Sequence, residues 1–140
     1  MLLLSVLLVI GAVLAGGCVA QETQVIEIIT PEEALTLIQE NQDNPNFVII
    51  DLRWPKLFAK VHIENAINID YDSETFQDEL NKLDKNKTYL IYYSCSCGPI
   101  DAQTLDMMAE LNFSEVYLML GGLDWWKKKG FPTVGEGVNQ

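Results

Sequence analysis

The stretch TYLIYYSCSCGPIDA, residues 88–102, decides how this chain folds. Residues 88–93 are β-branched, aromatic and aliphatic, which is typical of a buried strand. The region that follows carries apolar side chains at helical spacing, namely Ala102, Leu105, Met108, Ala109 and Leu111. Cys95 and Cys97 therefore lie in a short loop between the end of a strand and the start of a helix.

Such a loop favours reactive cysteine chemistry. Ligands of open α/β sheets bind at the carboxyl ends of the strands, and the N-terminus of a helix stabilises an anion, including a thiolate. A structural disulfide is disfavoured, because pairing Cys95 with Cys97 closes too small a loop to restrict the unfolded chain. Zinc needs four ligands and His62 is the chain's single histidine, so no metal or other cofactor is expected.

Length and charge narrow the class of protein. A chain of 140 residues has room for one domain with a real core. The formal net charge is −11, and residues 1–20 contribute nothing to it. This acidity disfavours nucleic acid as a partner and repels small anionic substrates at long range. We expect a monomer whose acidic surface keeps it soluble.

The N-terminus is typical of a targeting segment. Residues 2–15 are almost entirely apolar, but at ~1.5 Å per helical residue they are too short to cross a ~30 Å hydrocarbon core comfortably. The sequence LAGGC at 14–18 resembles a lipoprotein signal, which implies lipidation of Cys18. We predict a targeting segment at 1–18 and a tether at 19–24, with an exported domain anchored to the outer face of the cell membrane. An uncleaved anchor and a buried core segment are the alternatives.

Strands alternate with helices along the rest of the chain. Thr30-Pro31-Glu32-Glu33 predicts a helix start, with Thr as N-cap, Pro in the first turn and Glu completing a capping box. The alternation predicts an α/β sandwich with right-handed crossovers. Its strands are expected at 25–29, 47–50, 67–69, 88–93 and 116–120, and its helices from 30, at 56–60, from 73, at 102–111 and at 123–127.

The chain resembles the rhodanese family of single-domain sulfurtransferases over roughly residues 28–134. His62-Ile63 lies nine residues beyond Arg53. The motifs that carry the resemblance are Asp51-Leu52-Arg53, His62-Ile63, Ala66-Ile67-Asn68-Ile69, the cysteine loop, Gly121-Gly122, Trp126, Gly130 and Pro132. The resemblance implies a rhodanese-like domain at 25–136, a three-layer α/β/α sandwich with a mostly parallel central sheet.

The resemblance also assigns roles in the cysteine loop. Cys95 falls at the position of the catalytic nucleophile and Gly98 at the loop glycine. Ile100 stands where arginine is common, Asp101 where serine is usual, and Ser94 is an extra residue. The residues expected to surround the bound sulfur group are Ser96, Cys97, Gly98, Pro99 and Ile100.

Sulfur transfer is the function that this resemblance implies. The Cys95 thiolate takes a sulfane sulfur as a persulfide and passes it to a thiol or to cyanide. Thiosulfate is expected to be a poor donor, because the loop has no Lys or Arg and Asp101 adds a negative charge beside it. The expected partners are a small sulfur donor or a protein persulfide or thiol.

Two other functions remain open. Cys97 is either a spare small residue or a resolving thiol, and the second case makes the domain a thiol-redox or sulfur-relay module. A non-catalytic binding module is also possible, since fold does not fix function. A phosphatase is disfavoured, because no arginine is placed to contact phosphate at the loop.

For the residues around the loop, structural roles are favoured over catalytic ones. Asp51 and Arg53 are expected to support the site as a scaffold ion pair at a strand end. His62 is expected to be a capping or hydrogen-bonded residue rather than a general base. Trp126 is expected in the core, while Trp54 and Trp125 are candidates for lining the mouth of the site.

Overall fold

The computed structural model describes residues 23–95 and 100–138. Within those residues strands alternate with helices, as the sequence predicts. In chain order the elements are β1 (Val25–Ile29), α1 (Pro31–Glu40), β2 (Phe47–Asp51), α2 (Pro55–Lys60), β3 (Ile67–Asn68), α3 (Phe76–Lys82), β4 (Thr88–Tyr92), α4 (Ile100–Glu110), β5 (Glu115–Met119) and α5 (Gly122–Lys128).

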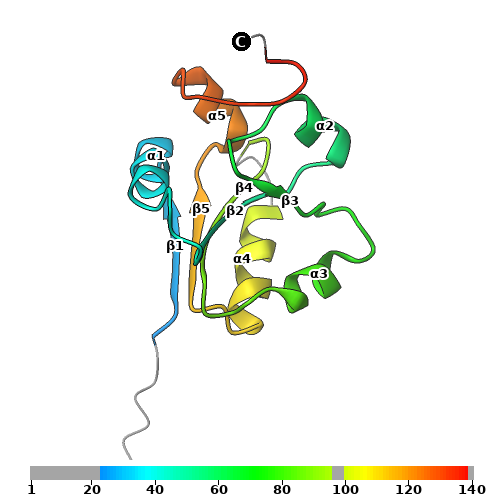
Figure 1. Cartoon of the computed structure of the whole chain (residues 1–140). Helices are drawn as coiled ribbons and strands as arrows, with labels where there is room; N and C mark the ends of the chain where they lie inside the picture. Colours follow the sequence, from blue (N-terminus) through cyan, green and yellow to red (C-terminus); the bar gives the residue numbers. More distant parts are fainter. Residues whose placement is uncertain (1–22, 96–99, 139–140) are drawn as a thin grey trace, which may run out of the picture.

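The strands form one five-stranded sheet in the order β1-β5-β4-β2-β3 (Figure 1). Every described strand pair is parallel. β4 is the middle strand, with β5 on one side and β2 on the other. The predicted α/β sandwich is therefore confirmed, and the strand that precedes Cys95 lies at the centre of its sheet.

The sheet divides the core into two halves, and β4 contributes to both. Tyr89 and Ile91 point into the half that α3 and α4 cover, whereas Leu90 and Tyr92 point into the half that α1 and α5 cover. Successive side chains of a strand point to opposite faces, so a strand covered on both sides is apolar throughout. The continuous apolar run of β4 follows from this central position.

The predicted capping box starts α1. The Glu33 N–H donates to Thr30 Oγ1 at 3.2 Å, and the Thr30 N–H donates to Glu33 Oε2 at 2.8 Å. Two backbone donors that a helix start leaves open are thereby satisfied.

Helix α4 corrects two sequence predictions. Ile100 is its first residue and does not belong to the loop, and Ala102 is exposed although it was expected on the apolar face. The polar residue Thr104 is buried on this face instead. Its hydroxyl donates to the Ile100 carbonyl at 2.9 Å, so burial does not leave the hydroxyl without a hydrogen-bond partner. The buried residues of α4 are Asp101, Thr104, Leu105 and Met108.

Several predictions concern residues outside the described ranges. These are the targeting segment 1–18 with Cys18, residues 19–22 of the tether, and the loop residues Ser96 to Pro99. Among residues 23–95 and 100–138, no helix has the length and apolar character needed to cross a membrane.

Candidate functional site

Cys95 lies three residues beyond the last residue of β4, at the carboxyl edge of the sheet. Its side chain is partly exposed. Helix α4 starts five residues later at Ile100, so the strand–cysteine–helix order predicted from the sequence is confirmed. This edge of a parallel sheet is where ligands of α/β proteins bind.

The backbone that leads to Cys95 is hydrogen-bonded on both of its sides. The Tyr92 carbonyl accepts the Leu52 N–H at 2.9 Å, on the β2 side. On the β5 side, the Tyr93 and Ser94 carbonyls accept the N–H groups of Leu123 at 2.8 Å and Asp124 at 2.9 Å. The first turn of α5 thus fixes the backbone immediately before the cysteine.

Gly122 makes this approach of α5 possible. Its φ is +55°, and a Cβ added there would overlap the Tyr93 carbonyl oxygen and lie 2.8 Å from the Ser94 carbonyl carbon. We expect Gly122→Ala to lower the free energy of unfolding by about 2–4 kcal/mol, because it adds strain at positive φ to a backbone clash. Urea denaturation measures the change.

Gly130→Ala is the matched control for Gly122→Ala. Its φ is +74°, but nothing lies within 4 Å of an added Cβ. It should cost only the ~1–2 kcal/mol of a left-handed residue. Equal losses in the two variants would show that the contact with Tyr93 and Ser94 does not matter.

The Cys95 sulfur is part of a disulfide bond in this structure. The other two cysteines of the chain, Cys18 and Cys97, lie outside the described residues. A disulfide holds the sulfur in an unreactive form, so reduction must precede any attack by a Cys95 thiolate.

Asp51 and Arg53 form the expected ion pair, and it is buried. Arg53 Nη2 lies 2.6 Å from Asp51 Oδ2 and Arg53 Nε lies 2.9 Å from Oδ1, with side chains only 6% and 0% exposed. Arg53 Nη2 also donates to the Val61 carbonyl at 2.6 Å. The arrangement connects the end of β2 to the segment after α2, so the charge of Arg53 is matched within the scaffold.

Sequence reasoning did not assign roles to two neighbours of this pair. Asn68 Nδ2 donates to the carbonyls of Asp51 at 2.9 Å and Arg53 at 2.7 Å. The Tyr92 hydroxyl accepts the Ile63 N–H at 3.1 Å. Burial, and then the negative charge of Asp51, raise the pKa of Tyr92 above its ordinary value. The sequence feature that could have indicated a role for Asn68 is its position in the motif Ala66-Ile67-Asn68-Ile69, which carries part of the family resemblance.

His62 is hydrogen-bonded to α2, as expected. Its Nδ1–H donates to the Phe58 carbonyl at 2.8 Å, since a carbonyl can only accept, and its ring stacks on Phe58 with centroids 3.9 Å apart. Trp126 is buried in the core and donates Nε1–H to the Pro132 carbonyl at 2.9 Å. Trp54 and Trp125 are exposed.

Three carboxylates act electrostatically on Tyr93, in the backbone that enters the cysteine loop. Burial, and then the charges of Asp72, Asp70 and Asp101, raise the pKa of Tyr93, two residues before Cys95. Arg53 acts in the opposite direction, but its charge is already paired with Asp51. Three carboxylates and one arginine thus act on this backbone, and the arginine is also paired with Asp51.

The described part of the chain contains no cluster of three or more His, Cys, Asp or Glu side chains able to hold a metal ion. Four of the residues expected to surround the bound sulfur group, Ser96 to Pro99, lie outside the described residues. The structure places Cys95 before this loop and Ile100 after it, as the first residue of α4.

Known proteins share both the sequence pattern and the fold. The family model of the rhodanese-like domain matches residues 30–129. The thiosulfate sulfurtransferase GlpE of Coxiella burnetii is 32% identical over 82 residues, covering 59% of this chain and 73% of the relative. GlpE of Actinobacillus pleuropneumoniae is 26% identical over 104 residues, covering 74% and 89%. An uncharacterized protein of Buchnera aphidicola is 27% identical, and the match spans 62% of this chain and 60% of that protein.

Solved structures give the same fold. A rhodanese-like domain from Anabaena superimposes with a TM-score of 0.62 at 23% identity, covering 78% of this chain and 79% of that one. A rhodanese-related protein from Thermoplasma volcanium superimposes with a TM-score of 0.63 at 22% identity, covering 79% and 99%. The structures show the fold, and the family model over residues 30–129 shows that the chain belongs to the rhodanese-like domain family.

Proposed function

We propose that this protein is a sulfurtransferase that carries sulfane sulfur as a persulfide on Cys95. The observation that carries the proposal is the place of Cys95, after the central strand β4 and before α4, in a rhodanese-like domain. Relatives named thiosulfate sulfurtransferase support the class of reaction. The positive end of the 11-residue α4 favours a thiolate or persulfide anion in the loop before it.

The proposed reaction has two balanced halves. The Cys95 thiolate attacks the outer sulfur of a donor, the donor's sulfur–sulfur bond breaks, and the donor remnant leaves with the electron pair. Cys95 then carries a persulfide anion. An acceptor thiolate attacks the outer sulfur, leaves as a persulfide and regenerates the Cys95 thiolate.

The sulfur donor is proposed to be a persulfide, on a small molecule or a protein, rather than thiosulfate. Asp70, Asp72 and Asp101 act together on Tyr93 beside the site. Arg53 offsets them only in part, because it also pairs with Asp51. A dianion is repelled by such a field about twice as strongly as a monoanion.

The ionic-strength dependence of sulfur loading tests this donor preference. Raising ionic strength from about 0.01 M to 0.15 M shortens the Debye length from ~30 Å to ~8 Å. We expect loading from thiosulfate to become about threefold faster or more, because the repulsion is screened. Loading from a monoanionic alkyl persulfide should change less. A thiosulfate rate that falls with salt would contradict an unfavourable field.

Intact-mass spectrometry of the reduced protein tests the proposed function itself. After incubation with an alkyl persulfide, polysulfide or thiosulfate, a sulfurtransferase gains the mass of one sulfur atom, which cyanide or a thiol removes. A protein that gains no sulfur from any donor would instead be a non-catalytic binding module.

The disulfide at Cys95 favours a second candidate function, a thiol-redox or sulfur-relay module. In that case Cys97 resolves a persulfide or sulfenic acid on Cys95 by forming a disulfide. Mild oxidation would then remove two hydrogens from the reduced protein. The transferase is favoured if sulfur loading survives in Cys97→Ser and mild oxidation removes no hydrogens from the reduced protein with both cysteines.

We further propose that the domain works outside the cytoplasm, tethered through residues 1–24. The apolar N-terminus and the LAGGC sequence at 14–18 support this. A disulfide at Cys95 also suits an oxidising compartment. Metabolic labelling with a fatty acid would report lipidation, and Cys18→Ser should abolish it.

A further inference from the structure

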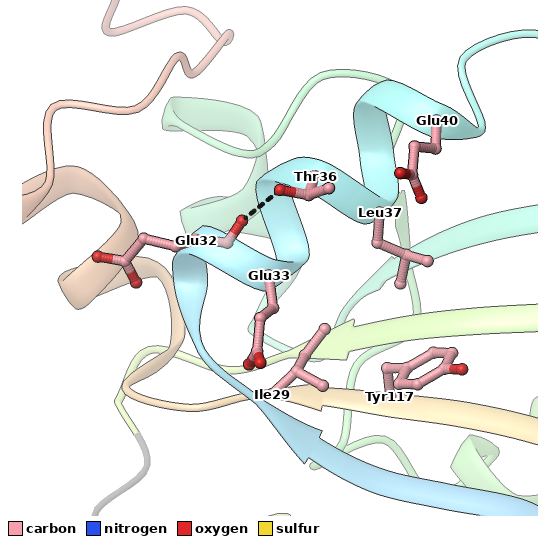
Figure 2. A pocket seen from close by; sticks show the side chains of 7 residues that line it. All are labelled: Ile29, Glu32, Glu33, Thr36, Leu37, Glu40 and Tyr117. Atoms are coloured by element: carbon pink, nitrogen blue, oxygen red, sulfur yellow. Dashed lines mark hydrogen bonds between the residues drawn. The ribbon is translucent and has the colours of Figure 1, made fainter.

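A groove of about 370 Å³ lies between helix α1 and the adjoining strands β1 and β5. It lies at the low end of the ~300–1,000 Å³ typical of ligand pockets. Figure 2 shows the side chains of Ile29, Leu37 and Tyr117 in the space between α1 and the strands. The groove thus has an apolar floor, and it is separate from the Cys95 loop in its lining residues.

Carboxylates stand at both ends of this apolar floor. Glu33 lies at one end, beside Ile29, and Glu40 at the other, while the Glu32 carboxylate near Glu33 points away from the floor (Figure 2). Glu33 and Glu40 are seven residues apart on α1, so their backbones are separated by about 10 Å along the helix axis. Glu27 adds a fourth carboxylate on the face of β1 that carries Ile29, paired in register with Tyr117.

The two carboxylates at the Glu33 end already have structural partners. Glu33 completes the capping box of α1, and Glu32 pairs with Lys129 at 2.5 Å. Glu40 has no ion-pair partner in the described part of the chain, and α1 has no basic residue in its last turn. A carboxylate is unfavourable at a helix C-terminus. The Glu40 carboxylate therefore destabilises the isolated domain, and no ion pair in the described part of the chain compensates for it.

Two carboxylates of β1 and β5, Glu27 and Glu115, act on Tyr117 at the floor of the groove. Its hydroxyl donates to Glu115 Oε1 at 2.7 Å. That hydrogen bond first, then burial and the charges of Glu115 and Glu27, raise the pKa of Tyr117 to about 12. Glu27 and Glu115 thus place negative charge beside the strand side of the groove, in addition to the glutamates of α1.

We propose that this groove binds a basic, extended segment of a partner protein. One apolar side chain of the segment packs on Ile29, Leu37 and Tyr117. Lys or Arg residues two positions before and after it, which point to the same face of an extended chain, meet Glu40 and Glu27 and the acidic end near Glu33. An extended chain rises about 3.3 Å per residue, so three to four residues span the groove. This binding site does not depend on the reaction at Cys95.

The probe, called the lysine–leucine peptide, is Lys-Ser-Leu-Ser-Lys, which in an extended conformation places both lysines and the leucine on one face. It is titrated into the ¹⁵N-labelled full chain, and amide shifts are followed by NMR. We expect saturable shifts at α1, β1 and β5, with weaker binding at higher salt. A peptide that replaces leucine with serine, and one that replaces lysine with glutamate, should bind at least tenfold more weakly.

Two charge-matched double variants locate the binding energy. Glu27→Gln with Glu40→Gln should weaken the lysine–leucine peptide about fivefold or more, since each exposed ion pair contributes modestly. Asp106→Asn with Glu110→Gln removes the same charge from exposed positions on α4 and should leave binding unchanged. Glu40→Gln alone should raise the thermal midpoint, because it removes the unfavourable charge at the end of α1.

Several results would overturn the proposal. These are an absence of saturable binding, equal weakening by both double variants, and equal affinity for the lysine–serine peptide. Spermine that displaces the peptide at equal concentration would show that the groove takes any polycation. None of these results bears on sulfur loading at Cys95.

Discussion

Cys95→Ser is expected to abolish sulfur loading from every donor, with a loss of about 10³-fold or more in transfer to cyanide or thiol. A serine hydroxyl cannot form a persulfide, and it is far less nucleophilic than a thiolate at neutral pH. Intact mass of the reduced protein, with and without an alkyl persulfide, measures the loading. Single-turnover release of sulfur to a thiol measures the transfer.

Cys97→Ser and Ser94→Ala are the matched controls. Both positions flank Cys95, so each reports the effect of altering the loop without removing the proposed nucleophile. Loading should survive in both variants when reduced protein is used. A Cys95→Ser protein that still gains and releases one sulfur would place the reactive thiol elsewhere and end the proposal.

Breaking the Asp51–Arg53 pair should cost about 3–5 kcal/mol in the free energy of unfolding, because either single change leaves a buried charge without its partner. The pair is 0% and 6% exposed at its side chains. We expect losses of this size for Asp51→Asn and for Arg53→Met, measured by urea denaturation. Since Asp51 and Leu52 are connected to Asn68 and Tyr92, the damage should reach the strand end that carries Cys95.

The double variant Asp51→Asn/Arg53→Met separates pairing from packing. It should be more stable than the sum of the two single losses predicts, because both charges are then gone. Asp124→Asn is the control, since Asp124 and Lys127 form an exposed pair at 3.6 Å that should contribute almost nothing. Additive losses would mean that the buried ion pair has no coupling of its own.

Local patterns were sufficient where neighbouring residues decide the structure. The capping box at Thr30–Glu33 uses donors and acceptors three residues apart, so the sequence contains the whole motif. The apolar run at 88–92 predicted a buried strand, since a central parallel strand needs apolar side chains on both faces. The ion pair of Asp51 and Arg53 spans only two residues and was also predictable.

Helical spacing alone predicted Leu105 and Met108 on the buried face of α4 correctly, but it did not predict the whole face. The predicted apolar stripe included Ala102, which is exposed, and omitted Thr104, which is fully buried. Thr104 is tolerated because its hydroxyl bonds to the carbonyl one turn earlier. A small alanine carries little burial energy, so which side of the helix faces the sheet is decided by the sum of its contacts.

The sequence by itself determined the alternation of strands and helices, the family, and the position of Cys95 between a strand and a helix. Only the tertiary structure decided that Leu123 and Asp124 of α5 hold the backbone before Cys95, that Asn68 joins Asp51 to Arg53, and that α1 and two strands enclose an acid-rimmed groove. The reason is that local propensity acts over a few residues. These contacts join segments 15 to 88 positions apart, whose meeting depends on the order of strands in the sheet.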